Sequence, residues 1–490
     1  MAIEHKCPLG WCLALPWLVA GLVAAGPDTR LADAIKNQDK AAIRALLAER
    51  VDVNTPQADG ATPLHWAAYR DDLETADLLI RAGAHVNAAN NYGVTPLALA
   101  CAHGGAAMVD KLLNARANPN AAQLTGETAL MTAARAGSVD AVKALLAHGA
   151  DANAREPWRG QTALMWAVGQ KHPEVARVLI ENGANVHARS TGGFTPLLFA
   201  ARQGDVETAR ILLAAKGDVN EAVPESSDDA ELVNDPGQVE RALAIGASAL
   251  VVATMSGHGA LAALLLDHGA NPDAAGAGYT ALHAAVLRGD LETVKVLLGH
   301  KADPNARVTK GYRSRSFSHD LVLGTDLVSA TPFFLAAKFA DVGIMRVLVD
   351  GGADPLATTK DGTTPLMAAA GLGWRDATDR RGRDMFDADT VGLDESSGLE
   401  SVKLAMELGG DVNAVNQSGD TAMHGAASRG LNPIVQFLAD HGAKLDVKNK
   451  RAQTPLSLAI GRRSPEAAGP QPKEARARTA DLLRQLGAVE

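Results

Sequence analysis

The sequence predicts an all-α repeat solenoid, in which about twelve helical pairs stack along one axis. A motif that begins with threonine recurs along the chain, as at Thr62, Thr95 and Thr128, which are 33 residues apart. The chain has 490 residues, too many for one hydrophobic core, and 47% are hydrophobic, enough to exclude a disordered protein. It contains 47 glycines and only 4% aromatics, which suggests small helices packed closely between tight turns.

Residues 1–25 are predicted to be a cleaved secretory signal. Residues 7–25 contain no charged side chain, and Val23-Ala24-Ala25 provides the small residues of a cleavage site. The alternatives are that the same stretch is retained as a membrane anchor or forms a buried N-terminal helix. The predicted location is therefore outside the cytoplasm, periplasmic or secreted, with anchoring by residues 7–25 as the alternative.

Cysteine usage agrees with export. Cys7 and Cys12 lie in the predicted signal, which leaves Cys101 as the one cysteine of the mature chain. A single thiol forms no internal disulfide and no cysteine-based zinc site. Because Cys101 replaces an alanine of the helical pattern, it is predicted to be a small core residue.

Twelve copies of the motif divide the chain. After a degenerate copy at Thr29, the copies begin at Thr62, Thr95, Thr128, Thr162, Thr195, Ser248, Thr280, Thr331, Thr364, Thr421 and Thr454. Repeats 1–6 are assigned to residues 26–220, and repeats 7–8 to residues 241–306. Repeats 9–11 and the start of repeat 12 are assigned to residues 329–461.

Each copy has the chemistry of two short helices. The threonine is placed as an N-cap, and a proline often follows at the first helical position, where its missing N–H costs nothing. A glycine such as Gly137 ends most first helices, because a left-handed C-terminal position favours it. Paired leucines such as Leu145-Leu146 mark the second helix, which stops at a Gly-Ala pair. One such helical pair cannot bury both its faces, so neighbouring units must stack.

These units resemble ankyrin repeats. The family signature stands complete at Thr62-Pro63-Leu64-His65, and its downstream element stands at Gly149-Ala150-Asp151-Ala152-Asn153. The resemblance covers almost all of the chain after the predicted signal. It implies a right-handed solenoid of antiparallel helix pairs, with β-hairpin fingers along one edge. It also implies a concave groove, lined by fingers and first helices, that usually binds another protein.

Six histidines have structural roles in this interpretation. The resemblance implies that His65, His283 and His424 hydrogen-bond within the motif rather than hold a ligand. A second set lies just before the Gly-Ala pair of second helices, where the helix dipole and free carbonyl groups favour histidine. This set consists of His148, His268 and His441.

Four longer segments interrupt the period. Residues 221–240 are predicted to be an acidic finger insertion, with seven carboxylates and no lysine or arginine. A solvated loop is expected there, with a calcium site or a contact for a basic partner as alternatives. Residues 307–328 lengthen another finger, residues 374–398 separate the helices of one unit, and residues 462–490 hold an insertion and a C-terminal capping helix. The aspartates of 374–398 do not match a calcium-binding loop, so no metal site is predicted.

Charge and motif content exclude several classes of function. The net charge of −9 argues against generic nucleic-acid binding, which needs a basic surface. The sequence contains no nucleophile elbow, no phosphate-binding loop and no zinc-protease helix motif. No catalytic residue and no cofactor are therefore predicted, and the protein is not expected to be an enzyme.

The aromatic residues supply the candidate binding site. The resemblance to ankyrin repeats implies that the residue after the histidine position of the first helix points toward the groove and that the fingers line its edge. Seven aromatics fall at such positions: Trp66, Tyr69, Tyr92, Trp158, Trp166, Phe194 and Phe199. Because a repeat core needs no aromatics there, they are predicted to bind a partner. The alternative is that they pack against one another or against the acidic insertion.

The predicted function is that of an exported, monomeric, non-catalytic scaffold that binds a protein or peptide in its groove. No nucleic-acid partner is predicted, and a membrane is involved only if the N-terminal segment is retained. One alternative is an enzyme, or a small-molecule or metal binder, with a site formed by the insertions. The other is a structural protein that assembles with itself.

Overall fold

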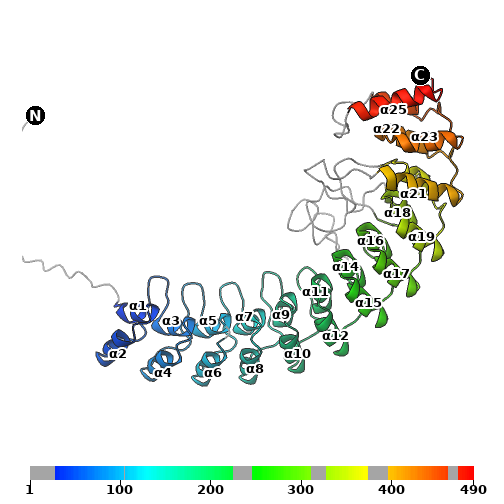
Figure 1. The fold of residues 1–490 in the computed structure, drawn as a ribbon. Helices are drawn as coiled ribbons and strands as arrows, with labels where there is room; N and C mark the ends of the chain where they lie inside the picture. The colour runs from blue at the N-terminus through cyan, green and yellow to red at the C-terminus, as the bar shows by residue number, and fades with distance from the viewer. Residues whose placement is uncertain are drawn as a thin grey trace, which may run out of the picture.

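The computed structural model describes residues 28–103, 105–224, 245–310, 327–373, 395–461 and 473–489. These residues form twelve helix pairs that follow one another along an arc (Figure 1). The first helix of each pair lies in an inner row on the concave side, and the second lies in an outer row on the convex side. The predicted all-α repeat solenoid is confirmed.

The inner row consists of α1 (Arg30–Lys36), α3 (Pro63–Tyr69), α5 (Pro96–Ala102), α7 (Ala129–Ala136), α9 (Ala163–Gly169), α11 (Pro196–Gln203), α14 (Ala249–Ser256), α16 (Ala281–Arg288), α18 (Pro332–Lys338), α20 (Pro365–Ala369), α22 (Ala422–Arg429) and α24 (Pro455–Ile460). The outer row consists of α2 (Lys40–Ala48), α4 (Leu73–Arg81), α6 (Ala106–Asn114), α8 (Val139–Ala147), α10 (Pro173–Glu181), α12 (Val206–Ala214), α15 (Gly259–Asp267), α17 (Leu291–Gly299), α19 (Val342–Asp350), α21 (Glu395–Glu407), α23 (Asn432–Asp440) and α25 (Lys473–Gln485).

Side-chain caps set where the inner helices begin. Thr95 Oγ1 accepts a hydrogen bond from Ala98 N at 3.2 Å, and Pro96 occupies the first helical position. The same cap begins eight further inner helices, at Thr128, Thr162, Thr195, Ser248, Thr331, Thr364, Thr421 and Thr454. The degenerate first copy differs, because Thr29 Oγ1 donates to Asp33 at 3.0 Å instead of capping α1.

Small residues let successive inner helices pack closely into one continuous core. Ala67 and Ala68 of α3 and Ala133 and Ala134 of α7 are fully buried, and each inner helix contacts the next along the whole row. Cys101 is a core residue, as predicted, and burial raises the pKa of its thiol to about 12. Its reactive thiolate form is therefore absent at neutral pH.

The fingers are shorter structures than the predicted β-hairpins. Most fingers without an insertion close on themselves across four residues, as from Asn90 N to Val94 O at 3.0 Å. Neighbouring fingers are joined by further backbone bonds, as from Leu124 N to Tyr92 O at 3.1 Å. Backbone N–H and C=O groups that would pair within a β-hairpin therefore form hydrogen bonds between neighbouring fingers. In the described ranges, β pairing is limited to two isolated bridges, at Ala122–Thr128 and Ala222–Ser248.

Asparagine side chains join successive repeats. Asn120 Nδ2 donates to Gly149 O at 2.9 Å, and its Oδ1 accepts from Asp151 N at 2.8 Å. The same pair of contacts is made by Asn54, Asn87, Asn153, Asn220, Asn305 and Asn413. Asp273 holds the equivalent place between α15 and α16 and accepts from Asp303 N at 2.8 Å, but its carboxylate has no N–H to donate.

Asp273→Asn is expected to stabilise the protein by about 1 kcal/mol, because the new amide can donate to a carbonyl of the next repeat. Asn305→Asp is the matched reverse change and is expected to destabilise by a similar amount. Urea unfolding followed by far-UV circular dichroism measures both. If Asp273→Asn left the unfolding midpoint unchanged, the asparagine donors would not be what holds the repeats together.

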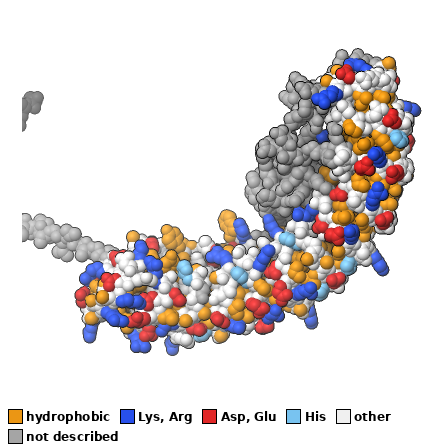
Figure 2. Space-filling view, viewed as in Figure 1, with side chains coloured by type: hydrophobic (Ala, Val, Ile, Leu, Met, Phe, Trp, Pro, Cys, Tyr) orange, Lys and Arg blue, Asp and Glu red, His pale blue; other side chains and the backbone are white. Residues whose placement is uncertain are grey.

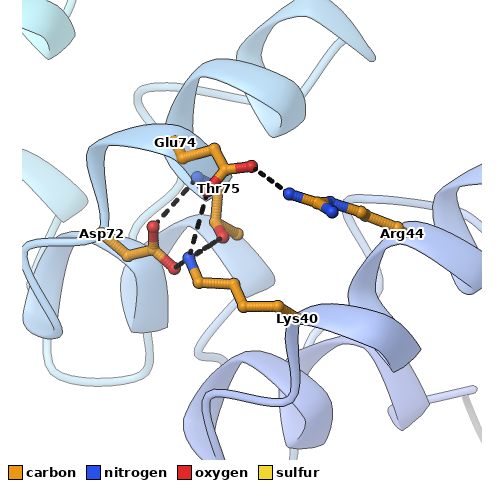
Figure 3. A network of polar contacts seen from close by, with 5 residues as sticks. All are labelled: Lys40, Arg44, Asp72, Glu74 and Thr75. Carbon is orange, nitrogen blue, oxygen red and sulfur yellow. Dashed lines mark hydrogen bonds and ion pairs between the residues drawn. The ribbon is translucent and has the colours of Figure 1, made fainter.

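An ion-pair network joins the first two repeats on the outer side (Figure 3). Lys40 of α2 pairs with Asp72 at 2.5 Å, and Asp72 in turn caps α4 by accepting from Thr75 N at 3.1 Å. Beside it, Arg44 pairs with Glu74 at 2.8 Å. The network ties the first repeat, which lacks its threonine cap, to the rest of the array.

The predicted signal and most of each predicted insertion lie outside the described residues. One boundary is corrected: α21 begins at Glu395, so the last residues assigned to the 374–398 insertion are helical. The predicted capping helix is α25, whose Leu483 is fully buried. Within the described ranges, no helix has both the length and the apolar character needed to span a bilayer.

Candidate functional site

The seven predicted aromatics lie on the inner helices and fingers between α3 and α11, along the concave side of the array. Four of them form two ring pairs, one on α3 and one at α11. The other three stand apart from one another. The structure therefore divides the predicted site into parts with different surroundings.

Trp66 and Tyr69 form the best-defined part. Their rings pack edge to face on α3, with centroids 5.8 Å apart. Trp66 Nε1 donates to Gln57 Oε1 at 2.7 Å, and Lys36 Nζ lies 4.8 Å from the Trp66 ring centroid. Tyr69 is 42% exposed, and its ring lies 4.7 Å from that of His103. The two rings are thus held in place while Tyr69 remains accessible.

Trp166 occupies the same helical position on α9 in different surroundings. It is half-buried, with the Arg135 guanidinium carbon 5.0 Å from its ring centroid. Its Nε1 is buried and has no hydrogen-bond partner in the part of the chain that the structure describes. The finger before α9 is one residue longer than the finger before α3, so Glu156 takes the place of Gln57. Its carboxylate accepts from the backbone N–H groups of Arg159 and Gln161 instead of from the indole. The two tryptophans are therefore not equivalent.

Phe194 and Phe199 pack against each other and against the core. Their centroids are 5.6 Å apart, and both side chains are half-buried. For this pair the packing alternative is the better description. The helices between Trp66 and Trp166 carry Leu99 and the buried Thr132 at the same position, so the aromatic strip is not continuous.

The fingers expose the largest apolar surface. Tyr92 is 65% exposed and Trp158 is 83% exposed, and Leu124, on the finger between them, is 78% exposed. Sequence reasoning missed Leu124 because it considered aromatics alone. Figure 2 shows hydrophobic side chains along the finger-bearing edge of the first repeats. We call Tyr92, Leu124 and Trp158 the finger-tip row.

Basic residues at the ends of inner helices were also missed. Lys36, Arg70, Arg135 and Arg202 are exposed on the concave side of the first six repeats, within the last turn or at the cap of α1, α3, α7 and α11. Their recurrence just before the turn to the outer helix could have been read from the repeat register. We call these four residues the basic row.

The motif histidines take the structural roles expected of them. His283 is fully buried; its Nδ1 accepts from Thr280 N at 3.2 Å, and its Nε2 donates to Ala330 O at 3.3 Å. His65 and His424 make the same two contacts. At the ends of outer helices, Nδ1 bonds the carbonyl four residues back in His148, His268 and His441.

The described residues contain no group of three or more histidine, cysteine or acidic side chains arranged to hold a metal ion. A pocket of about 380 Å³ lies between α24 and α25, with Arg476 and Arg484 in its lining. It is at the far end of the chain from the predicted aromatics. Insertions two and three, which the small-molecule alternative needs, fall largely outside the described residues.

Comparison with known proteins agrees with this architecture. The family described as "Ankyrin repeats (3 copies)" matches residues 31–123, 107–190, 130–223, 226–308 and 395–468, well over half of the chain. The mouse B-cell lymphoma 3 protein homolog is 30% identical over 155 residues, which cover 29% of this chain and 35% of the relative. Human B-cell lymphoma 3 protein is 31% identical over 182 residues, covering 27% and 40%.

Human neurogenic locus notch homolog protein 1 is 35% identical over 135 residues, which cover 27% of this chain and 4% of the relative. The chain spans less than half the length of these curated relatives. The family model matches segments that contain the repeats described above. This chain belongs to the ankyrin-repeat family.

Proposed function

We propose that the concave surface over α1 to α11 binds a protein or peptide segment and has no catalytic role. The observation that carries this proposal is the finger-tip row, in which three successive fingers each expose a large apolar side chain. Such side chains contribute nothing to the packing of the repeats. Large apolar side chains exposed on successive fingers are typical of a protein interaction site.

The groove floor supports the same proposal. Trp66 is fixed by Gln57 and Lys36 before any partner arrives, so its ordering costs little on binding. Tyr69 lies beside it with its ring accessible. A partner segment lying between the inner helices and the fingers would therefore meet Trp66 and Tyr69 on one side and the finger-tip row on the other.

Trp66→Ala combined with Trp158→Ala is expected to weaken partner binding about 100-fold, because buried aromatic contacts at interfaces are worth about 2 to 4 kcal/mol. Proteins captured from a native extract by the wild type and by the double variant give the first measurement, and titration of a captured partner gives the second. Phe437→Ala on the outer helix α23 is the control. If the wild type, the double variant and the control captured identical sets of proteins, the groove would not be the binding site.

We also propose that the protein is exported and monomeric. The uncharged stretch 7–25 and the small residues Val23-Ala24-Ala25 at its end support export. Fusion of residues 1–30 to a reporter that is active only outside the cytoplasm tests it, and an inactive reporter would refute it. Stable self-association without other bound proteins, measured by sedimentation, would favour the structural alternative instead.

A further inference from the structure

Building on the proposed function, we infer that the partner segment is acidic, with its carboxylates bound by the basic row beside the groove aromatics. The basic row is Lys36, Arg70, Arg135 and Arg202. The inference concerns which partner the surface accepts, not whether it binds one.

Charge is sorted between the two rows of helices. The eleven inner helices from α3 to α24 contain five lysines and arginines and no aspartate or glutamate. By contrast, each of the eleven outer helices from α4 to α25 contains at least one carboxylate. The overall charge of −9 is therefore concentrated away from the inner helices. The first inner helix, α1, is the exception, because it carries Asp33, whose Oδ1 accepts from Gln57 Nε2 at 2.7 Å. From α3 onward, an acidic segment approaching the inner helices meets cations without facing carboxylates on those helices.

The helix dipole does not account for this sorting. It favours cations at the C-terminal end of any helix, inner or outer. Five outer helices nevertheless end on a carboxylate, at Glu181, Asp267, Asp350, Glu407 and Asp440. By contrast, none of the inner helices in the described ranges ends on a carboxylate. Six of them carry a cation in the last turn: Lys36, Arg135, Arg202, Arg288, Lys338 and Arg429. The difference follows the face of the solenoid, not the end of the helix.

The cations are accessible only in the first half of the array. Beyond it, Arg288 is half-buried and donates to Met255 O at 2.8 Å, and Lys338 is buried and donates to Gly373 O at 2.7 Å. Arg429 is buried as well. These three side chains lie largely inside the fold, whereas all four members of the basic row are exposed. Within the row, Arg135 also lies 3.8 Å from the Glu127 carboxylate, so an acidic partner would compete with this exposed ion pair.

The exposed cations lie against the groove aromatics. Lys36 lies over Trp66, Arg70 is 5.7 Å from the Tyr69 ring centroid, and Arg135 lies over Trp166. Arg70 Nη2 also donates to Lys36 O at 2.8 Å, which holds the first two members of the row together. A segment with a carboxylate next to an apolar side chain fits this alternation of cation and ring, since charge-assisted hydrogen bonds and ring contacts form side by side.

Selection of displayed random 12-residue peptides on the full-length protein tests the inference. The row variant is Lys36→Gln/Arg70→Gln/Arg135→Gln. The matched control, Lys143→Gln/Arg210→Gln/Arg346→Gln, removes the same charge from exposed positions of α8, α12 and α19. Peptides selected on the wild type and on the control are expected to contain at least threefold more aspartate and glutamate than the library. That excess should disappear on the row variant.

One selected peptide is then synthesised with each aspartate and glutamate replaced by asparagine or glutamine. Its affinity for the wild type is expected to fall tenfold or more, which needs no protein variant to be folded. Selected peptides without an acidic excess, or an unchanged affinity of the amide peptide, would overturn the inference and leave the proposed function standing. If no peptides were enriched on the wild type, the acidic-partner inference and the proposed peptide-binding function would both be contradicted.

Discussion

Lowering the pH from 7 to 4.5 is expected to reduce the free energy of unfolding by about 2 to 3 kcal/mol through His283 alone. Burial lowers the pKa of His283 to about 4, because the fully buried ring cannot solvate a charge. Protonation would also place a hydrogen on Nδ1, which already accepts from Thr280 N. The ring is therefore bound as the neutral form.

The sign of the effect follows from proton binding. An unfolded histidine has a pKa near 6.5, so between about pH 6.5 and pH 4 the unfolded chain binds a proton that the folded chain does not. Acid therefore favours unfolding as the pH falls below about 6.5. The stability that comes from keeping His283 neutral is fully present only above that pH. Burial lowers the pKa of His65 and His424 as well, so both contribute in the same direction.

His283→Gln separates this effect from other titrations. Glutamine at the third helical position can still reach back to the N-cap N–H but does not titrate. We expect the variant to be less stable than the wild type at pH 7, yet to lose about 2 to 3 kcal/mol less between pH 7 and pH 4.5. Urea unfolding at both pH values and constant salt measures the double difference. Parallel losses in the two proteins would show that His283 is not the titrating group.

The helices could be predicted because their ends are set by chemistry within a few residues. A threonine hydroxyl capping the N–H three positions on, with proline between them, forms the same structure wherever it occurs, as at Thr95 and Thr454. The same holds for the motif histidines, whose partners are the cap itself and a carbonyl of the next finger.

The candidate site could be predicted only in part, because it depends on contacts between repeats. Trp66 and Trp166 share a register position, yet only the Trp66 indole N–H is held by its finger, through Gln57. In the longer finger before α9, the Glu156 carboxylate accepts backbone N–H groups of that finger instead, and the Trp166 indole N–H has no partner among the described residues. Phe194 and Phe199 turned out to pack together. Leu124 was overlooked because it is aliphatic, although it is more exposed than Tyr92.

The fingers also depend on contacts between repeats, and glycine is what allows them. Gly246 has φ +75, and a Cβ there would overlap the carbonyl group of Gly276 on the next finger. Gly276 has no left-handed backbone, but its own Cβ would overlap Gly246 O. Gly269, at the end of α15, has φ +87 with open space around it. Alanine substitutions at these three positions therefore distinguish the cost of a left-handed backbone from the cost of crowding between fingers.

Gly246→Ala is accordingly expected to destabilise the protein by about 3 kcal/mol or more, because it combines a left-handed alanine with overlap of two backbones. Gly269→Ala introduces the strain alone and should cost about 1 kcal/mol, and Gly276→Ala introduces the overlap alone and should cost about 2 kcal/mol. Urea unfolding of the three variants gives the comparison. If Gly246→Ala cost no more than Gly269→Ala, the fingers would be able to move apart freely. The same crowding recurs in the finger-tip row, where a Cβ on Gly93 would lie 2.8 Å from Leu124 N. The comparison therefore also indicates how rigid an edge that row offers to a bound partner.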